Sequence, residues 1–165
     1  MKNNFKTIEN IKENKGLIWS PVIITYESSN KDIPNQYLLV IIDLKTSKIV
    51  NYRILNHRVR SGDVNNALFE ILNSSRTKNN SDFIHTLNGT PFTTNIFKEF
   101  LTEHGLKHSL YSRHEILPII ETVKLFIKKF YEFYNETDLI NFIKFWNDHF
   151  TNILIKFITK YENNK

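Results

Sequence analysis

The sequence of 165 residues contains no cysteine. Disulfide bonds, zinc sites built on thiolates and cysteine nucleophiles are therefore excluded. No apolar run is long enough to cross a bilayer. Residues 1–16 are polar, without the apolar segment of a signal peptide. We therefore expect a soluble, cytoplasmic protein with no membrane association, in which residues 1–16 form a polar tail and residues 17–165 form one domain with its own core.

Acidic residues are fewer than basic ones, 17 against 22, which gives a formal net charge of +5. One interpretation is an anionic partner such as nucleic acid. The other is compositional drift, because lysine far outnumbers arginine and Asn, Ile and Phe are abundant, as expected from A/T-rich coding sequences. The basic residues are scattered along the chain, so the composition leaves both interpretations open.

Three segments in the first third of the chain have the length and composition of strands. Residues 17–27 include Pro21, which favours an edge strand or a bulge at that point. Residues 36–44 are almost continuously apolar, as in a strand that is covered on both faces. Residues 49–55 alternate between apolar and polar side chains. Short connections separate the three segments, which predicts an antiparallel meander.

The rest of the chain alternates between helix and strand patterns. In order, these are a helix over 64–72, a strand over 83–87 with a turn after it, a helix over 95–105, a strand over 106–112 and a helix that starts at Pro118. Asp63 can cap the first of these helices, and Thr93 or Thr94 the second, which Gly105 ends. This order predicts an α/β fold with a five-stranded mixed sheet and helices on both faces.

Aromatic side chains concentrate in the last third of the chain, where we expect two helices with a break near residues 134–138. Apolar side chains repeat at helical spacing in both helices. They include Ile119, Val123, Phe126, Ile127, Phe130 and Phe133 in the first, and Phe142, Ile143, Trp146 and Phe150 in the second. Such stripes are far more typical of a core or a dimer surface than of a ligand site. We therefore expect a homodimer that forms through the C-terminal helices.

Several phrases in this order resemble the catalytic core of retroviral-type integrases and DDE insertion-sequence transposases, which has a ribonuclease H-like fold. Trp19 followed by IITY is similar to the first strand of that family, often W-x-x-D-I-T-Y. Residues 37–54, YLLVIIDLKTSKIVNYRI, are similar to its second and third strands. Residues 84–113, which begin IHTLNGTPFT, resemble the segment that begins H-S-D-R-G-S-Q-Y-T, and ETVKLFIKKFY resembles the last catalytic helix. The resemblance covers residues 17–134 and leaves 135–165 as a divergent C-terminal helix.

Enzymes of this family cut and join DNA with two Mg²⁺ or Mn²⁺ ions held by two aspartates and a glutamate. Such ions lie about 3.5–4 Å apart and require several converging anionic oxygens. The resemblance places the glutamate on Glu121 but the two aspartates on Ile23 and Leu87, whose side chains cannot bind a metal. We therefore expect a triad reduced to Glu121, no bound cofactor, and a catalytically inactive homologue.

The present role of such a domain has several alternatives. The resemblance places Arg113, Lys124 and Lys128 around the former active site, which predicts weak and salt-dependent DNA binding. In the second alternative these side chains form a solvated helix face, and the domain serves only in assembly with other protein chains. A DNA titration at two salt concentrations, beside sedimentation without DNA, distinguishes the two.

The third alternative is an active metal-dependent nuclease with rewired carboxylates. Asp43, Asp82 and Glu115 are the candidates for the replacement, at a strand end, before a strand and in a loop. A zinc site has little support, because His104 and His108 have i,i+4 spacing but a glycine separates them at the end of a helix.

Overall fold

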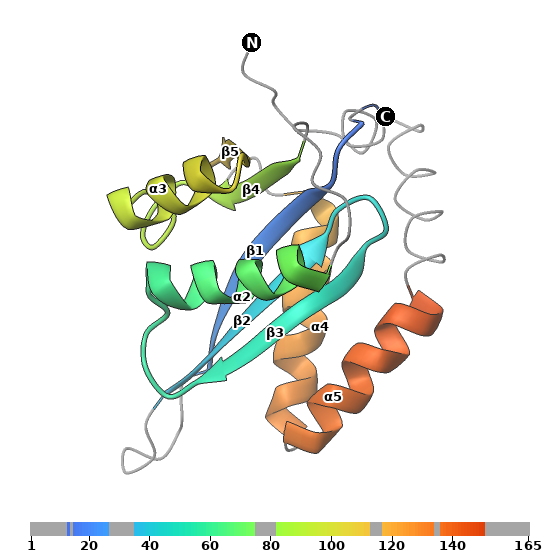
Figure 1. The fold of residues 1–165 in the computed structure, drawn as a ribbon. Coiled ribbons are helices and arrows are strands. Elements are labelled where there is room, and N and C mark those ends of the chain that lie inside the picture. Colours follow the sequence, from blue (N-terminus) through green and yellow to red (C-terminus); the bar gives the residue numbers. More distant parts are fainter. Residues whose placement is uncertain are drawn as a thin grey trace.

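The computed structural model describes residue 13 and residues 15–26, 35–74, 82–112, 117–133 and 136–150, apart from the side chains of 129–133, 136–139 and 150. Its elements are β1 (Ile18–Tyr26), β2 (Gln36–Asp43), β3 (Lys48–Leu55), α2 (Ser61–Ser74), β4 (Phe83–Leu87), α3 (Asn95–Glu103), β5 (Lys107–Tyr111), α4 (Pro118–Phe133), α5 (Glu136–Phe145) and the π-helical turn η2 (Trp146–Phe150) (Figure 1). The predicted order of strands and helices is confirmed. The predicted polar tail lies almost entirely outside the described residues, and so does the end of the chain after Phe150.

The five strands form one mixed sheet, as predicted, and their order in it is β3-β2-β1-β4-β5. The β1–β2 and β2–β3 pairs are antiparallel, whereas β1–β4 and β4–β5 are parallel. Pro21 does not lie on an edge strand, because β1 is the central strand. However, β4 pairs with β1 only at Ile18 and Trp19. Pro21 lies further along β1, beyond the part that pairs with β4, so its missing N–H interrupts no hydrogen bonds between β1 and β4.

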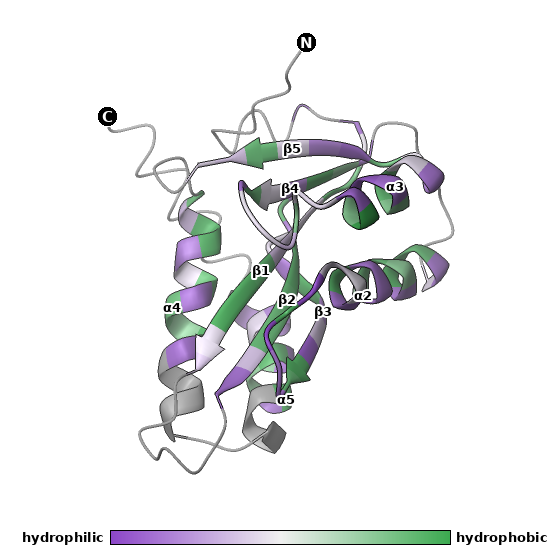
Figure 2. Cartoon of the chain, turned by 90° about the vertical axis from the view of Figure 1, so that its left-hand side faces the viewer, coloured by the Kyte–Doolittle hydropathy of each residue, from purple (hydrophilic) through white to green (hydrophobic). Residues whose placement is uncertain are grey.

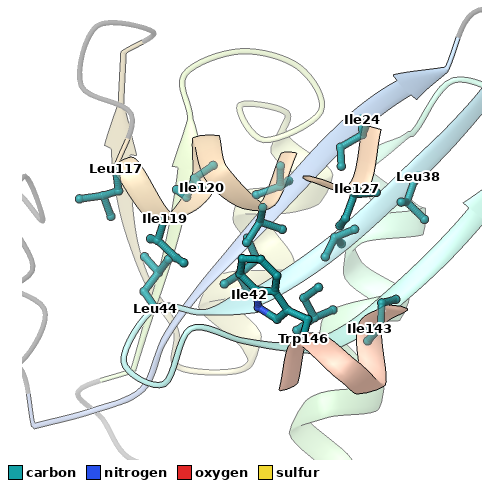
Figure 3. Packing of buried hydrophobic residues seen from close by; sticks show 14 of the residues in the cluster. Ile24, Leu38, Ile42, Leu44, Leu117, Ile119, Ile120, Ile127, Ile143 and Trp146 are labelled. Carbon is teal, nitrogen blue, oxygen red and sulfur yellow. The ribbon is translucent and has the colours of Figure 1, made fainter. Parts of the chain in front are cut away.

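Helices cover both faces of the sheet, with α2 and α3 on one face and α4 and α5 on the other (Figures 1 and 2). Each face carries its own apolar cluster. The α4-side cluster includes Val22 and Val40. It also includes Ile42, Ile120, Ile127 and Trp146, which are labelled in Figure 3. The α2-side cluster includes Leu39, Ile41, Leu68, Ile84, Phe97 and Leu101. Because successive strand residues point to opposite faces, neighbours in β1 and β2 belong to different clusters. None of the described helices has the length and apolar character that spanning a membrane requires.

The start of α2 differs from the prediction. The helix begins at Ser61, so Asp63 lies in its first turn instead of preceding it. The Asp63 carboxylate accepts a hydrogen bond of 2.8 Å from the Arg60 N–H, and the Asp63 N–H donates to the Arg60 carbonyl at 3.1 Å. The aspartate therefore caps the helix from its first turn, as the residue at position N3 of a capping box does.

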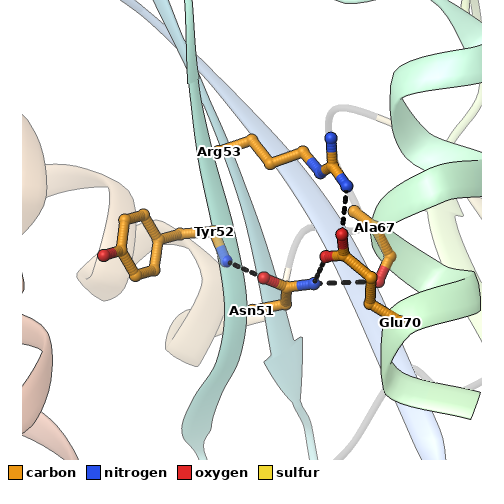
Figure 4. Close-up of polar contacts among 5 residues, drawn as sticks. All are labelled: Asn51, Tyr52, Arg53, Ala67 and Glu70. Atoms are coloured by element: carbon orange, nitrogen blue, oxygen red, sulfur yellow. Dashed lines mark hydrogen bonds and ion pairs between the residues drawn. The ribbon is translucent and has the colours of Figure 1, made fainter. Parts of the chain in front are cut away.

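Polar side chains connect α2 to the edge strand β3 (Figure 4). The Asn51 amide donates to the Ala67 carbonyl at 2.9 Å and to the Glu70 carboxylate at 3.0 Å. Arg53 donates to the same carboxylate at 2.6 Å. Because the Glu70 side chain is more than half exposed, this ion pair adds little stability. The amide contacts therefore do more to hold α2 on the sheet.

The ends of α3 follow the prediction. Thr94 is the N-cap, and its hydroxyl accepts a hydrogen bond from the Phe97 N–H at 3.2 Å. After His104 the chain reverses at Gly105, whose φ of +67° is favourable for glycine and unfavourable for residues with a Cβ.

The C-terminal elements pack onto the sheet beside the edge strand β3. Trp146 is fully buried, and its indole Nε1–H donates to the Ser47 carbonyl at 2.9 Å. The Asn147 amide accepts from the Ile49 N–H and donates to the Ile49 carbonyl, both at 2.8 Å. It thereby satisfies backbone groups that an edge strand otherwise exposes. Phe142 joins the α4-side cluster. Of the two roles predicted for this apolar stripe, core or dimer surface, these residues therefore take the first.

Candidate functional site

The ends of β4 and β5 lie beside the start of α4, on the face of the sheet that α4 covers (Figure 2). Leu87 is the last residue of β4 and packs, partly buried, against the α4-side cluster. Tyr111 is the last residue of β5 and belongs to the same cluster. Glu121 lies in the first turn of α4 with its side chain exposed, close enough to Tyr111 for its charge to act on the phenol. The fold therefore gathers Leu87, Tyr111 and Glu121 in one place.

The β1 residue that shares this face is Val22 and not Ile23. Val22 is 4% exposed and belongs to the α4-side cluster, against which Leu87 also packs. Ile23 packs against the α2-side cluster, on the opposite face of the sheet. Successive side chains of a strand point to opposite faces of the sheet, so Val22 and Ile23 cannot both lie on the face that α4 covers. Ile23 is therefore not brought together with Leu87 and Glu121, and Val22 takes the predicted place of Ile23.

The side chains gathered on this face do not fit the pair of Mg²⁺ or Mn²⁺ ions that the family resemblance implies. The side chains of Val22 and Leu87 carry no atom that can bind a metal ion. Among Val22, Leu87 and Glu121, Glu121 therefore supplies the carboxylate. Within the described ranges, no group of three His, Asp or Glu side chains lies close enough together to hold a metal ion. Two hard cations need several converging anionic oxygens, and the three side chains gathered here supply one carboxylate, that of Glu121.

Asp43, one candidate for a replacement carboxylate, serves the turn between β2 and β3. Its side chain is buried. One carboxylate oxygen accepts a hydrogen bond from the Lys45 N–H at 2.9 Å, and the other accepts one from the Thr46 hydroxyl at 2.7 Å. Both oxygens are thus engaged in local structure, a frequent role for aspartate in turns.

Asp82, the second candidate, lies at the start of β4, whereas Leu87 lies at its end. The Asp82 side chain is buried and accepts a hydrogen bond from the Leu17 N–H at 2.8 Å. This contact fastens the start of β1 beside the start of β4, and it places the carboxylate away from the strand end that Leu87 occupies. The third candidate, Glu115, lies outside the described residues.

Buried polar side chains lie next to the apolar ones on the same face. The His85 ring is buried, with Nδ1 at 3.1 Å from the Ser109 hydroxyl and its centroid 4.6 Å from that of Tyr111. Burial raises the pKa of Tyr111 to about 12; the neighbouring Ser20 hydroxyl opposes this shift and the negative charge of Glu121 adds to it. The Ser20 Oγ is itself buried without a hydrogen bond of acceptable geometry to the described residues. At neutral pH the Tyr111 phenol is therefore uncharged.

The two histidines with i,i+4 spacing have separate structural roles. The His104 ring Nδ1 lies 2.9 Å from the Phe100 carbonyl at the end of α3. His108 is on β5, with Nε2 at 2.8 Å from the Thr86 hydroxyl and its ring edge-on to Phe97 at 5.3 Å. Burial, together with the positive charge of Lys98, lowers the pKa of His108 to about 4.

We expect His108 to make the folded state less stable in acid. The unfolded chain protonates this imidazole near pH 6.5, whereas the folded chain does so only near pH 4. The folded state therefore has its full stability with respect to this group above pH 6.5. It loses stability as the pH falls from 6.5 to 4, because only the unfolded chain binds the proton there. Urea unfolding of the wild type and His108→Gln, at neutral pH and at about pH 5, measures this. The variant should lose less stability over the interval, and equal losses in the two proteins would contradict the assignment.

Of the three cations predicted around the site, the structure describes two. Lys124 and Lys128 lie one turn apart on α4, and Lys128 is exposed while Lys124 is partly so. Their spacing from Glu121 places the three side chains along one side of the helix. The same side exposes Leu125, at 57%. Arg113 lies outside the described residues.

No protein-family model and no curated protein matches the chain by sequence. Solved structures do match its fold. A chain of the simian T-cell lymphotropic virus intasome, in a complex with the PP2A regulatory subunit B56 gamma, matches 80% of this chain with a TM-score of 0.61 and 15% identity. This chain spans 48% of the length of that one.

The catalytic core domain of HTLV-2 integrase in complex with magnesium also matches. Its dimeric form has a TM-score of 0.57 and 19% identity, over 78% of this chain and 83% of that chain. Its trimeric form has a TM-score of 0.58 and 18% identity, over 78% and 82%. At such identities the likeness shows the fold alone, and the strand order and the helices on both faces agree with it. The chain has the fold of a retroviral integrase catalytic core, an α/β fold of the ribonuclease H-like type.

Proposed function

We propose that this chain is a non-catalytic domain with an integrase-core fold. The observation that carries the proposal is the apolar pair Val22 and Leu87, which share a face with Glu121 where a metal pair would need further carboxylates. The HTLV-2 core was solved in complex with magnesium. In this chain, Val22 and Leu87 on the face that α4 covers pack with the α4-side cluster. Full burial of an aliphatic side chain contributes about 1.5–3 kcal/mol, so these residues favour stability of the fold over metal binding.

A DNA cleavage assay in Mg²⁺ and in Mn²⁺ tests this proposal. We expect the wild type to cleave no more DNA than Glu121→Gln, because neither protein holds a pair of metal ions. The variant is a matched control for contaminating nucleases, since Glu121 is exposed and its replacement by an amide leaves the fold intact. Cleavage by the wild type that Glu121→Gln abolishes would overturn the proposal, and it would favour rewired carboxylates.

We further propose that the α4 side of the domain retains weak DNA binding. Phosphate contacts require cations in reach of the backbone but no metal and no catalytic group. Lys124 and Lys128 provide two such cations along one side of α4, on a chain whose formal net charge is +5. Binding of this kind carries little sequence preference and weakens steeply as salt is added.

Replacing both lysines should weaken DNA binding and its dependence on salt. For Lys124→Gln/Lys128→Gln we expect the slope of log affinity against log salt to fall by about two, because two phosphate contacts are lost. Fluorescence anisotropy at several salt concentrations measures the slope. Lys48→Gln/Lys144→Gln is the matched control, since both side chains are exposed on other elements. Equal slopes for the two double variants would show that α4 does not contact DNA.

Assembly with another protein chain is the second candidate function. Large apolar side chains are exposed on α2 and α3, where Phe69 is 48% and Ile96 is 62% exposed. Others lie on α5, where Ile140 is 46% and Phe145 is 49% exposed, and these are available for the homodimer through the C-terminal helices. Exposed apolar groups of this kind are common at interaction surfaces. Sedimentation without DNA decides: a stable dimer with no DNA affinity favours assembly, and a monomer with salt-dependent affinity favours DNA binding.

A further inference from the structure

We propose that Asn88 is a site of spontaneous deamidation, which places a new carboxylate at the end of β4. Asn88 directly follows Leu87, the last residue of the strand, and its side chain is exposed. Gly89 comes next, and this is the one asparagine–glycine pair in the sequence. Asparagine is among the thermolabile residues, and a following glycine is the neighbour that hinders its cyclisation least.

The backbone around Gly89 leaves the reacting atoms accessible. Deamidation begins when the backbone nitrogen of the next residue attacks the amide carbon of the asparagine side chain. Apart from Gly89 and its two chain neighbours, no heavy atom lies within 4 Å of the place where a Cβ of Gly89 would be, and its φ of +148° is one that residues with a Cβ rarely adopt. In the described part of the chain, neither the Gly89 N–H nor the Asn88 side chain makes a hydrogen bond.

Backbone hydrogen bonds hold both ends of the turn that contains Asn88 and Gly89. The Asn88 N–H donates to the Tyr111 carbonyl at 2.9 Å, and the Phe92 N–H donates to the Gly89 carbonyl at 2.9 Å. Neither bond involves an atom that changes in the reaction. The turn therefore holds Asn88 and Gly89 at the surface, and its hydrogen bonds leave the Gly89 nitrogen and the amide carbon of Asn88 available for the reaction.

The reaction balances with water as its single co-reactant. The Gly89 nitrogen forms a bond to Asn88 Cγ, the bond from Cγ to Nδ2 breaks, and ammonia leaves with the proton that the Gly89 nitrogen loses. Water then opens the cyclic imide at either carbonyl, which yields aspartate or isoaspartate. Nothing is oxidised or reduced. The product lowers the formal net charge of +5 by one and adds an anion at the strand end beside Leu87.

Incubation of the folded full chain at mildly alkaline pH, followed by peptide mass spectrometry over time, tests the proposal. We expect Asn88 to convert about tenfold faster or more than Asn95, which corresponds to roughly 1.4 kcal/mol in the barrier. Asn95 is an internal control, because it is also exposed but precedes the bulky, β-branched Ile96 at the start of α3. An isoaspartate-specific methyltransferase assay identifies the second product.

Asn88→Gln is the matched variant, since its longer side chain closes the ring less readily and the wild-type side chain makes no hydrogen bond to the described residues. The variant should show no conversion at position 88 and no isoaspartate. Conversion of Asn95 as fast as Asn88 would overturn the proposal. So would conversion in urea but not in the folded chain, because the turn would then protect Asn88. Neither readout involves DNA or metal, so the outcome is independent of the proposed function.

Discussion

The double variant Val22→Asp/Leu87→Asp is expected to unfold at a much lower temperature than the wild type when no metal is present. Val22 is 4% exposed and Leu87 is partly buried, both against the α4-side cluster. Carboxylates at these places lose hydration, and they also repel Glu121 and each other. We expect a loss of about 3–5 kcal/mol in the free energy of unfolding, as for uncompensated buried charges. Thermal and urea unfolding measure it, and a loss near zero would contradict this packing.

The same variant should regain stability when Mn²⁺ is added. Asp at positions 22 and 87 shares one face with Glu121, so the three carboxylates can converge on a cation only in the folded chain. A ligand that binds the folded state alone adds about 2.7 kcal/mol at a hundredfold excess over its Kd. Ile23→Asp/Leu87→Asp is the matched control, because it also adds two aspartates but places one of them on the opposite face. If Mn²⁺ raised the unfolding free energy of the control but not that of the Val22 variant, β1 would have to be rotated from the orientation described.

Trp146→Ala is expected to cost about 3–5 kcal/mol of unfolding free energy, as large-to-small changes at buried aromatic positions do. The side chain is fully buried in the α4-side cluster and donates a hydrogen bond to the Ser47 carbonyl. Its ring lies 6.0 Å from that of Phe142 on α5. The loss thus reflects both a cavity and an unsatisfied carbonyl beside the edge strand β3.

Phe145→Ala is the matched control for this prediction. Phe145 precedes Trp146 in the chain but is 49% exposed. Its truncation should cost about 1 kcal/mol or less, as changes at the surface do. Urea unfolding of both variants measures the difference. Similar small losses in the two would contradict the packing of the C-terminal elements onto the sheet.

The strands could be predicted from the sequence because each one carries its own apolar pattern between turn residues. β2 is covered on both faces, and its run of apolar residues showed this directly. The start of α2 could not be placed, because Ser61 and Gly62 have low helix propensity and Asp63 is a favoured cap. The hydrogen bond from Arg60 to Asp63 decides the start, and it exists only once the turn has formed.

The candidate site could be predicted in part. Leu87 and Glu121 were found from local phrases, and the structure places both on the face that α4 covers. The β1 position was ambiguous by one residue, since counting forward from Trp19 in W-x-x-D reaches Val22 while counting back from Tyr26 in D-I-T-Y reaches Ile23. A shift of one residue moves a strand side chain to the opposite face, and only the packing of both faces resolves it.

Other features of the site depend on contacts between distant parts of the chain. Ser20 and Tyr111 meet because β1, β4 and β5 are neighbours in the sheet, which no local pattern reveals. The pairing of Asn147 with the backbone of Ile49 is likewise long-range. No local pattern in the sequence indicated that Asn147 would dock on β3.

Anomalous diffraction from a crystal soaked in manganese chloride is the most direct measurement of the missing metal centre. We predict no pair of manganese ions between β1, β4 and the start of α4, because Val22 and Leu87 line that space with carbon atoms. Two manganese peaks about 4 Å apart, bridged by Glu121 and other acidic side chains of this chain, would contradict the prediction.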